Sequence, residues 1–90
     1  MRIGQIVCSL AGSDKNTFLV VVETNDKSLL VCDGKRYKLS KPKRKNTKHI
    51  APTSKVLSQQ ELTTDKALRK ALAVFRNTND KEKSLCQKQI

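Results

Sequence analysis

Three hydrophobic segments in the first third of the chain predict β-strands. They are rich in β-branched and aromatic residues and lack the 3.6-residue period of a helix. They are Ile6–Leu10, Thr17–Thr24 and Ser28–Cys32. Small and polar residues, typical of turns, separate them: Ala11–Asn16 is a turn-type segment, and Asn25–Lys27 predicts a hairpin connection.

Two further strands are expected after the turn signal Asp33-Gly34. Residues Arg36–Leu39 alternate in polarity, which predicts a strand with Tyr37 and Leu39 pointing inward. His49–Ala51 could supply a last short strand. Five short strands joined by tight turns predict a mainly β fold, a small SH3-like β-barrel whose closure removes the exposed sheet edges.

A helical period appears after Pro52. Hydrophobic residues recur at i, i+3, i+4 and i+7, which places them on one face of an amphipathic helix from about Thr64 to Arg76. They are Leu68, Ala71, Leu72 and Phe75. Thr63 or Thr64 can cap this helix, while Ser58–Glu61 matches a capping box and leaves open an earlier start or a separate turn.

One segment, Lys35–Lys48, carries most of the net charge. The chain has 19 Lys and Arg against 8 Asp and Glu, a net charge of +11 and a pI near 10.0. The segment has eight cations and no acid, and therefore contributes +8 of the +11: Lys35, Arg36, Lys38, Lys41, Lys43, Arg44, Lys45 and Lys48. Like charges at this density repel one another, and their natural counterpart is a polyanion.

We expect Lys41–Lys45 to form a basic loop between two strands, because this stretch is polar and interrupted by Pro42. Such a loop binds nucleic acid strongly and in a salt-dependent manner. Two other interpretations stay open, a solvated loop that keeps the protein soluble and a nuclear-localisation signal of the same composition.

Aromatic side chains that could stack on bases are scarce. Phe18 begins a buried strand and Phe75 lies on the apolar helix face, so both are expected in the core. Tyr37 could stack on a base or ribose, although its alternation with Leu39 favours the core. We therefore expect recognition through phosphates and shape.

Other function classes find little support. The acidic residues are scattered, and the single histidine, His49, has neither a nucleophile partner nor a second metal ligand near it in sequence. No apolar run exceeds the five residues Phe18–Val22, against roughly 20 needed to span a bilayer. The first residues also lack the features of a secretory signal. We expect a cytoplasmic, non-enzymatic protein without cofactor, metal or small-molecule substrate.

Several ordered blocks resemble the KOW-domain family, specifically its short ribosomal-protein-like members. The blocks are Gly4–Val7, Ala11–Lys15, Phe18–Val22, Asp33-Gly34, Pro42–Lys45 and Lys48–Thr53. Bacterial KOW-domain RNA-binding proteins share this layout, as does the amino-terminal half of certain archaeal and eukaryotic large-subunit ribosomal proteins. The resemblance covers about residues 3–53, with a weaker echo in Leu62–Leu72. It implies an SH3-like barrel that binds RNA, typically ribosomal RNA, without catalysis.

The resemblance also implies that the first loop joins the basic loop in contacting RNA. Here this loop offers Gly12, Ser13 and Lys15. Asn16 stands where the family usually has Gly, and since Asn tolerates a positive φ we expect the turn to form. Ser13 stands where Arg is common, which lowers the charge of the loop.

These observations predict a ribosome-associated protein that binds ribosomal or other structured RNA. We expect residues 1–53 to form the barrel with its basic loop, 54–76 a linker and helix, and 77–90 a polar, flexible tail. The alternatives are an SH3-like protein-interaction module, with a partner docked on the helix, and a general binder of polyanions such as DNA or an anionic membrane surface.

Overall fold

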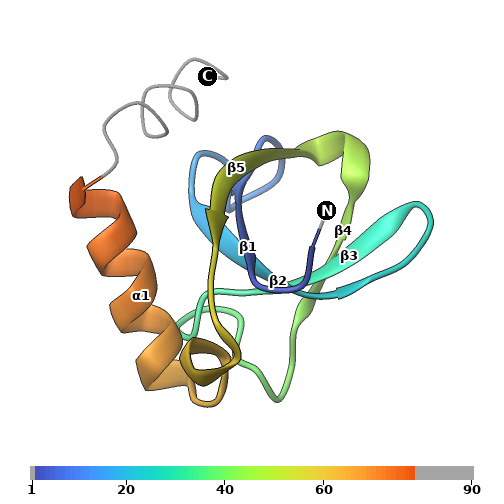
Figure 1. The fold of residues 1–90 in the computed structure, drawn as a ribbon. Helices are drawn as coiled ribbons and strands as arrows, with labels where there is room; N and C mark the ends of the chain where they lie inside the picture. Colours follow the sequence, from blue (N-terminus) through green and yellow to red (C-terminus); the bar gives the residue numbers. More distant parts are fainter. Residues whose placement is uncertain (1, 79–90) are drawn as a thin grey trace.

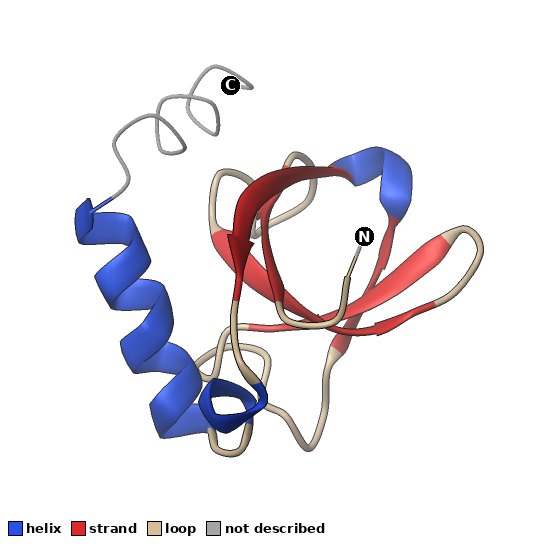
Figure 2. Cartoon of the chain, in the orientation of Figure 1, coloured by secondary structure: helices blue, strands red, loops and turns tan. Residues whose placement is uncertain are grey.

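The described part of the chain forms a single antiparallel sheet in the order β4-β3-β2-β1-β5, followed by one α-helix (Figures 1 and 2). The computed structural model describes residues 2–78. The strands are β1 (Gln5–Ser9), β2 (Phe18–Thr24), β3 (Ser28–Cys32), β4 (Lys43–Asn46) and β5 (Ile50–Val56). Two 3₁₀-helices, η1 (Thr47–His49) and η2 (Gln59–Leu62), precede α1 (Asp65–Thr78). The mainly β fold class and its carboxyl-terminal amphipathic helix are confirmed.

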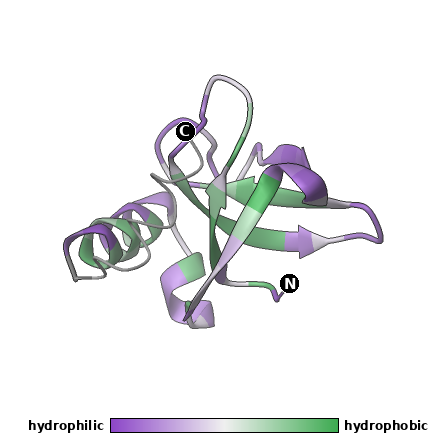
Figure 3. Ribbon diagram, turned by 90° about the horizontal axis from the view of Figure 1, so that it is seen from above, coloured by the Kyte–Doolittle hydropathy of each residue, from purple (hydrophilic) through white to green (hydrophobic). Residues whose placement is uncertain are grey.

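The first three strands bury side chains on both faces of the sheet. One face packs against α1 through Ile6, Cys8, Phe18, Val20 and Cys32. The opposite face carries a second cluster of Val7, Leu19, Val21, Leu29, Val31 and Ile50. Because both faces are covered, these strands are continuous hydrophobic runs rather than alternating ones. In Figure 3 these strands are coloured mostly in the green of hydrophobic residues.

Helix α1 attaches to the sheet by the face that the sequence predicts. Leu68, Leu72 and Phe75 are buried, and the Phe75 ring meets the Phe18 ring edge-on at 5.1 Å between centroids. Thr64 caps the helix by accepting a hydrogen bond from the Ala67 N–H at 3.1 Å. The helix and the strands therefore share one core.

The chain before α1 forms a separate turn rather than an earlier helix start. The Ser58 N–H donates to Glu61 Oε1 at 3.0 Å, the backward half of a capping box, and this stabilises η2. Helix α1 extends to Thr78, two residues beyond the predicted end. Of the tail expected at 77–90, residues 79–90 lie outside the described part of the chain.

The expected closure of the sheet is not observed. Within residues 2–78, strand β4 pairs only with β3 and strand β5 only with β1, so both are edge strands of this sheet, joined by the single turn of η1. Both edges carry features that discourage pairing with another chain. Lys43 and Arg44 are exposed on β4, and Pro52 in β5 has no backbone N–H to donate to a further strand.

The prediction of a strand at Arg36–Leu39 is wrong. This stretch has no ladder partner and lies in an irregular connection between β3 and β4. The carboxylates of Asp33 and Asp65 accept hydrogen bonds from backbone N–H groups of this stretch, which would otherwise pair with a neighbouring strand. The alternation still holds for burial, because Tyr37 and Leu39 are half-buried while Arg36 and Lys38 are exposed.

The prediction of a loop at Lys41–Lys45 is wrong over most of its length, because Lys43–Asn46 is strand β4. Strand β4 pairs with Ser28–Val31 of β3. Because β4 is an edge strand and can face solvent, it can form with few apolar side chains. The last strand is longer than expected: His49 belongs to η1, and β5 continues from Ile50 through Pro52 to Val56. Within residues 2–78, no helix combines the length and hydrophobicity needed to cross a membrane.

Candidate nucleic-acid interface

The structure places seven of the eight predicted cations of Lys35–Lys48 in exposed positions. They lie on the β3–β4 connection, on β4 and on η1, and they are Lys35, Arg36, Lys38, Lys41, Lys43, Arg44 and Lys48. Gly12, Ser13 and Lys15 of the first loop are exposed as well. The eighth cation, Lys45, has a different role.

Lys45 forms a nearly buried ion pair with Asp14 of the first loop. Its Nζ lies 2.6 Å from Asp14 Oδ1, and the two side chains are 10% and 3% exposed. Lys45 also donates to the Ala11 carbonyl at 3.0 Å, and the Ser9 hydroxyl donates to the same Asp14 oxygen at 2.7 Å. This ion pair fastens the first loop to β4, so Lys45 holds the two predicted RNA-binding segments together instead of facing a ligand.

The hydrogen bonds around Asp14 favour its ionised form. Burial raises the pKa of the Asp14 carboxyl, but hydrogen bonds from Lys45 and Ser9, together with the positive charge of Lys45, outweigh that effect. The pKa of Asp14 is therefore held below its ordinary value. A charged Asp14 keeps the ion pair intact at neutral pH.

A second contact joins the first loop to the β3–β4 connection. Arg36 Nη2 donates to the Ser13 hydroxyl at 2.7 Å, and Arg36 Nη1 donates to the Ser13 carbonyl at 3.4 Å. The Arg36 guanidinium carbon also lies 5.6 Å from the centre of the Tyr37 ring. The turn forms as expected, with Asn16 at φ 69°. The two segments that the resemblance assigns to RNA are thus adjacent.

Carboxylates near the basic segment bind backbone donors. Asp33 Oδ1 accepts hydrogen bonds from the Lys35 and Tyr37 N–H groups at 2.9 and 2.8 Å. Asp65, the first residue of α1, accepts one from the Leu39 N–H at 2.8 Å. These bonds give the irregular connection a defined conformation, and they replace the ladder that a strand would have formed.

Arg69 and Gly34 complete the attachment of the connection to α1. Arg69 Nη1 donates to the Gly34 carbonyl at 2.7 Å. Gly34 has φ +78°, and a Cβ atom there would collide with the Asp65 carbonyl oxygen. The turn and the start of the helix are therefore in close backbone contact.

Sequence reasoning did not assign Asp14, Asp65 or Arg69 to the site. The pair Asp33-Gly34 predicts a turn, and an Asp before Gly is a signal for the side-chain-to-backbone hydrogen bonds observed. The other contacts join residues 26 to 35 positions apart, and no local pattern in one sequence shows such pairs.

The connection folds around a surface depression of about 420 Å³. Tyr37 and Pro42 contribute apolar walls, and four cations and a serine complete the lining: Arg36, Lys38, Lys41, Lys43 and Ser40. Tyr37 also packs against the core cluster on the adjacent face of the sheet. Its ring is therefore part of the core and part of this surface.

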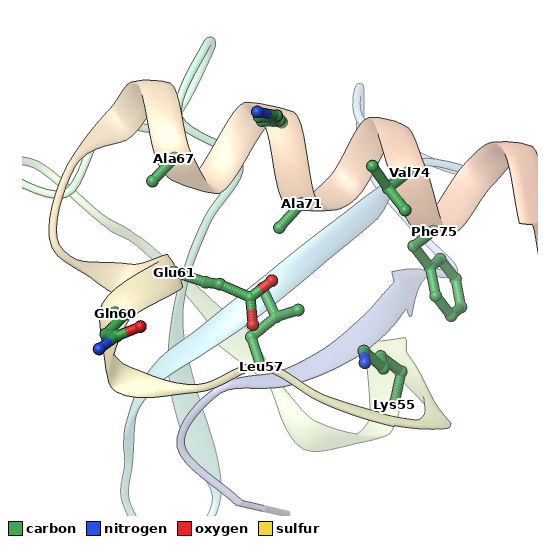
Figure 4. Close-up of a pocket in the computed structure, with 9 residues that line it drawn as sticks. Lys55, Leu57, Gln60, Glu61, Ala67, Ala71, Val74 and Phe75 are labelled. Carbon is green, nitrogen blue, oxygen red and sulfur yellow. The ribbon is translucent and has the colours of Figure 1, made fainter.

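A second depression, of about 370 Å³, lies between α1 and the chain that follows β5 (Figure 4). Ala71, Val74 and Phe75 of α1 face Leu57 across it, and Lys55 and Glu61 add one charge of each sign to the lining (Figure 4). It shares no lining residue with the depression at Tyr37. Its apolar residues offer a surface for the alternative of a protein partner.

Among residues 2–78, no group of three or more His, Cys, Asp or Glu side chains is arranged to hold a metal ion. No protein-family model matches the sequence. No curated protein matches it either.

Proposed function

We propose that the protein binds RNA, and that the exposed cations of Lys35–Lys48 and the first loop contact its phosphate backbone. The observation that carries this proposal is the separation of charge. Seven cations of this segment are exposed, while the nearby carboxylates of Asp14, Asp33 and Asp65 bind an ammonium or backbone N–H groups of the protein itself. Among residues 2–78, none of these seven exposed cations forms an ion pair, so the described carboxylates leave the positive charge of this surface in place.

The contacts that hold this segment also favour binding. The ion pair Asp14–Lys45 and the bonds from Asp65 and Arg69 fix the backbone before any ligand arrives. A fixed backbone reduces the entropy lost on binding, so that mainly the lysine and arginine side chains must be ordered.

Charge alone does not distinguish RNA from DNA, and the choice of RNA rests on the resemblance to KOW domains. The five-stranded antiparallel sheet has the number of strands expected from this resemblance, although the sheet is not closed. On this basis the protein is a non-catalytic, cytoplasmic RNA-binding protein that associates with ribosomal RNA or another structured RNA.

The test is the affinity for structured RNA across a salt series. If about five phosphates are neutralised, log K falls against log salt with a slope of roughly −3.5 to −4.5. Replacing Lys43, Arg44 and Lys48 by Gln is expected to weaken binding and flatten the slope. The matched control replaces three exposed cations of α1, Lys66, Lys70 and Arg76, and is expected to change binding much less. Equal losses in both triple variants would indicate attraction by net charge only.

The alternatives predict different competitors. A general polyanion binder would be displaced equally by duplex DNA or by anionic lipid vesicles, whereas an RNA-binding protein prefers RNA at the same salt. A protein-interaction module would keep its partner after nuclease treatment and lose it through substitutions in the depression beside α1. Co-sedimentation with large ribosomal subunits at moderate salt, and release at high salt, would support the ribosomal assignment.

A further inference from the structure

The depression formed by Arg36–Lys43 combines an aromatic ring and a proline with four cations. We propose that it holds one unpaired nucleotide of the bound RNA, with the base against Tyr37 and Pro42 and the adjoining phosphates against the surrounding lysines. This inference rests on the proposed function and adds to it a class of RNA structure, a bulge, loop or single-stranded end.

The Tyr37 ring is held in place from two sides. It packs against the buried cluster that includes Val31 and Ile50. The Arg36 guanidinium lies over the ring, with its carbon 5.6 Å from the ring centre, and donates a hydrogen bond to the Ser13 hydroxyl that fixes its position. A base can therefore stack here without first ordering the aromatic side chain, which is the usual cost of forming such a platform.

The volume of the depression suits one nucleotide rather than a longer segment of RNA. Its volume of about 420 Å³ lies at the lower end of the range typical for small-ligand pockets. The seven described residues that line it all belong to the short stretch Arg36–Lys43, so it is a local hollow rather than a groove that could follow a duplex. Bases within an A-form helix are stacked and paired, and only an unpaired base can enter such a hollow.

The charges of the lining match the rest of a nucleotide. Arg36, Lys38, Lys41 and Lys43 surround the ring and proline, and none of the carboxylates in the described part of the chain contributes to the lining. Lysine ammonium groups on flexible stems can reach the phosphates on either side of an inserted base. An acidic peptide would satisfy these cations but would leave the aromatic and proline walls without a planar partner.

The experiment uses the single tyrosine of the chain as a reporter. Because the sequence has one Tyr and no Trp, isotope-labelled tyrosine gives one set of ring signals, all from Tyr37. The probes are an adenylate RNA hexamer and the same hexamer without bases, which carry equal numbers of phosphates. We expect the hexamer with bases to bind about 5- to 10-fold more tightly and to shift the ring signals upfield, as a stacked base does.

Two variants test the walls of the depression. Tyr37→Leu is expected to remove the preference for the hexamer with bases, while Tyr37→Phe, which retains the ring, keeps it. Since Tyr37 also belongs to the core, Pro42→Ala serves as a second variant on a half-buried wall outside the core clusters. It is expected to reduce the preference about two- to three-fold with unchanged thermal stability.

The outcomes separate this inference from the proposed function. Equal binding of both hexamers, with the steep salt dependence retained, would overturn the nucleotide site and leave RNA binding standing. Absence of salt-dependent binding to either hexamer and to structured RNA would overturn both. If a hexaglutamate peptide shifts the Tyr37 ring signals as strongly as the adenylate hexamer, the depression recognises negative charge only and the inference is wrong.

Discussion

The ammonium of Lys45 lies 2.6 Å from the carboxylate of Asp14, and both side chains are almost completely shielded from solvent. The two residues are 31 positions apart, one in the first loop and the other on edge strand β4. Their contact turns one cation of a basic segment into a structural element and leaves its neighbours exposed. It also predicts how the protein responds to substitution and to acid.

Removing the ammonium of Lys45 is expected to destabilise the fold. Lys45→Met leaves the buried Asp14 carboxylate without its counter-ion, which costs about 3 kcal/mol in the free energy of unfolding. Urea denaturation measures this loss. Lys43→Met, an exposed position on the same strand, is the matched control and is expected to change stability by no more than about 0.5 kcal/mol. Equal effects at the two positions would show that the ion pair contributes nothing to stability.

The same pair predicts a stability change in acid. The pKa of Asp14 is lowered in the folded state from its ordinary value of 3.8, so the unfolded chain binds the proton more readily. The stabilisation is therefore complete above pH 3.8 and is lost as the pH falls through the lower pKa of the folded state. Urea midpoints measured across this range are expected to fall more steeply for the wild type than for Asp14→Asn. Parallel curves for the two proteins would exclude Asp14 as the source.

Gly34→Ala is expected to destabilise the junction between the basic segment and α1. The residue has φ +78°, and an added Cβ would collide with the carbonyl of Asp65, which belongs to the backbone and cannot rotate away. A cost of about 2 kcal/mol or more is expected from the left-handed conformation and this collision together. Gly12→Ala is the control: its φ is +89°, but the Cβ would meet only side-chain atoms of Lys45 and Asp14, at 3.3 and 3.5 Å. A larger loss at Gly12 than at Gly34 in thermal denaturation would contradict this account.

Asp65→Ala is expected to weaken RNA binding although it raises the net charge by one. Without the carboxylate, the Leu39 N–H loses its acceptor and the connection becomes less ordered before binding. Ordering it on binding is expected to reduce the affinity about two- to five-fold. Asp65→Asn, which removes the charge but keeps an oxygen acceptor, is expected to bind at least as tightly as the wild type. If Asp65→Ala binds RNA more tightly than the wild type in a filter-binding or fluorescence-anisotropy assay, the gain in net positive charge affects the affinity more than the preformed conformation of the β3–β4 connection does.

The parts of the fold that follow a local period could be predicted from the sequence. The β-branched run that begins at Phe18 indicated a buried strand, and the spacing of Leu68, Leu72 and Phe75 indicated the buried face of α1. Asn16, with its tolerance for positive φ, indicated that the first turn forms. In each case neighbouring residues determine the local conformation and the side that is buried.

The parts that depend on distant partners could not be predicted in this way. Arg36–Leu39 alternates like a strand, but Asp33 and Asp65 accept hydrogen bonds from its backbone and keep it out of the sheet. Lys43–Asn46 has the composition of a loop and becomes a strand because β3 offers a free edge. For the candidate site, the sequence indicated the exposed cations but not that Lys45 would turn inward to Asp14.

The most direct test of the central claim compares RNA binding of the wild type with the Lys43, Arg44 and Lys48 to Gln variant across a salt series. For the wild type, the account predicts a slope of log K against log salt of roughly −3.5 to −4.5. The variant is expected to have a slope shallower by up to about 3, while the control altered at Lys66, Lys70 and Arg76 retains the wild-type slope. A flat wild-type slope, or identical slopes for the wild type and the basic-segment variant, would contradict the claim that this segment binds phosphates.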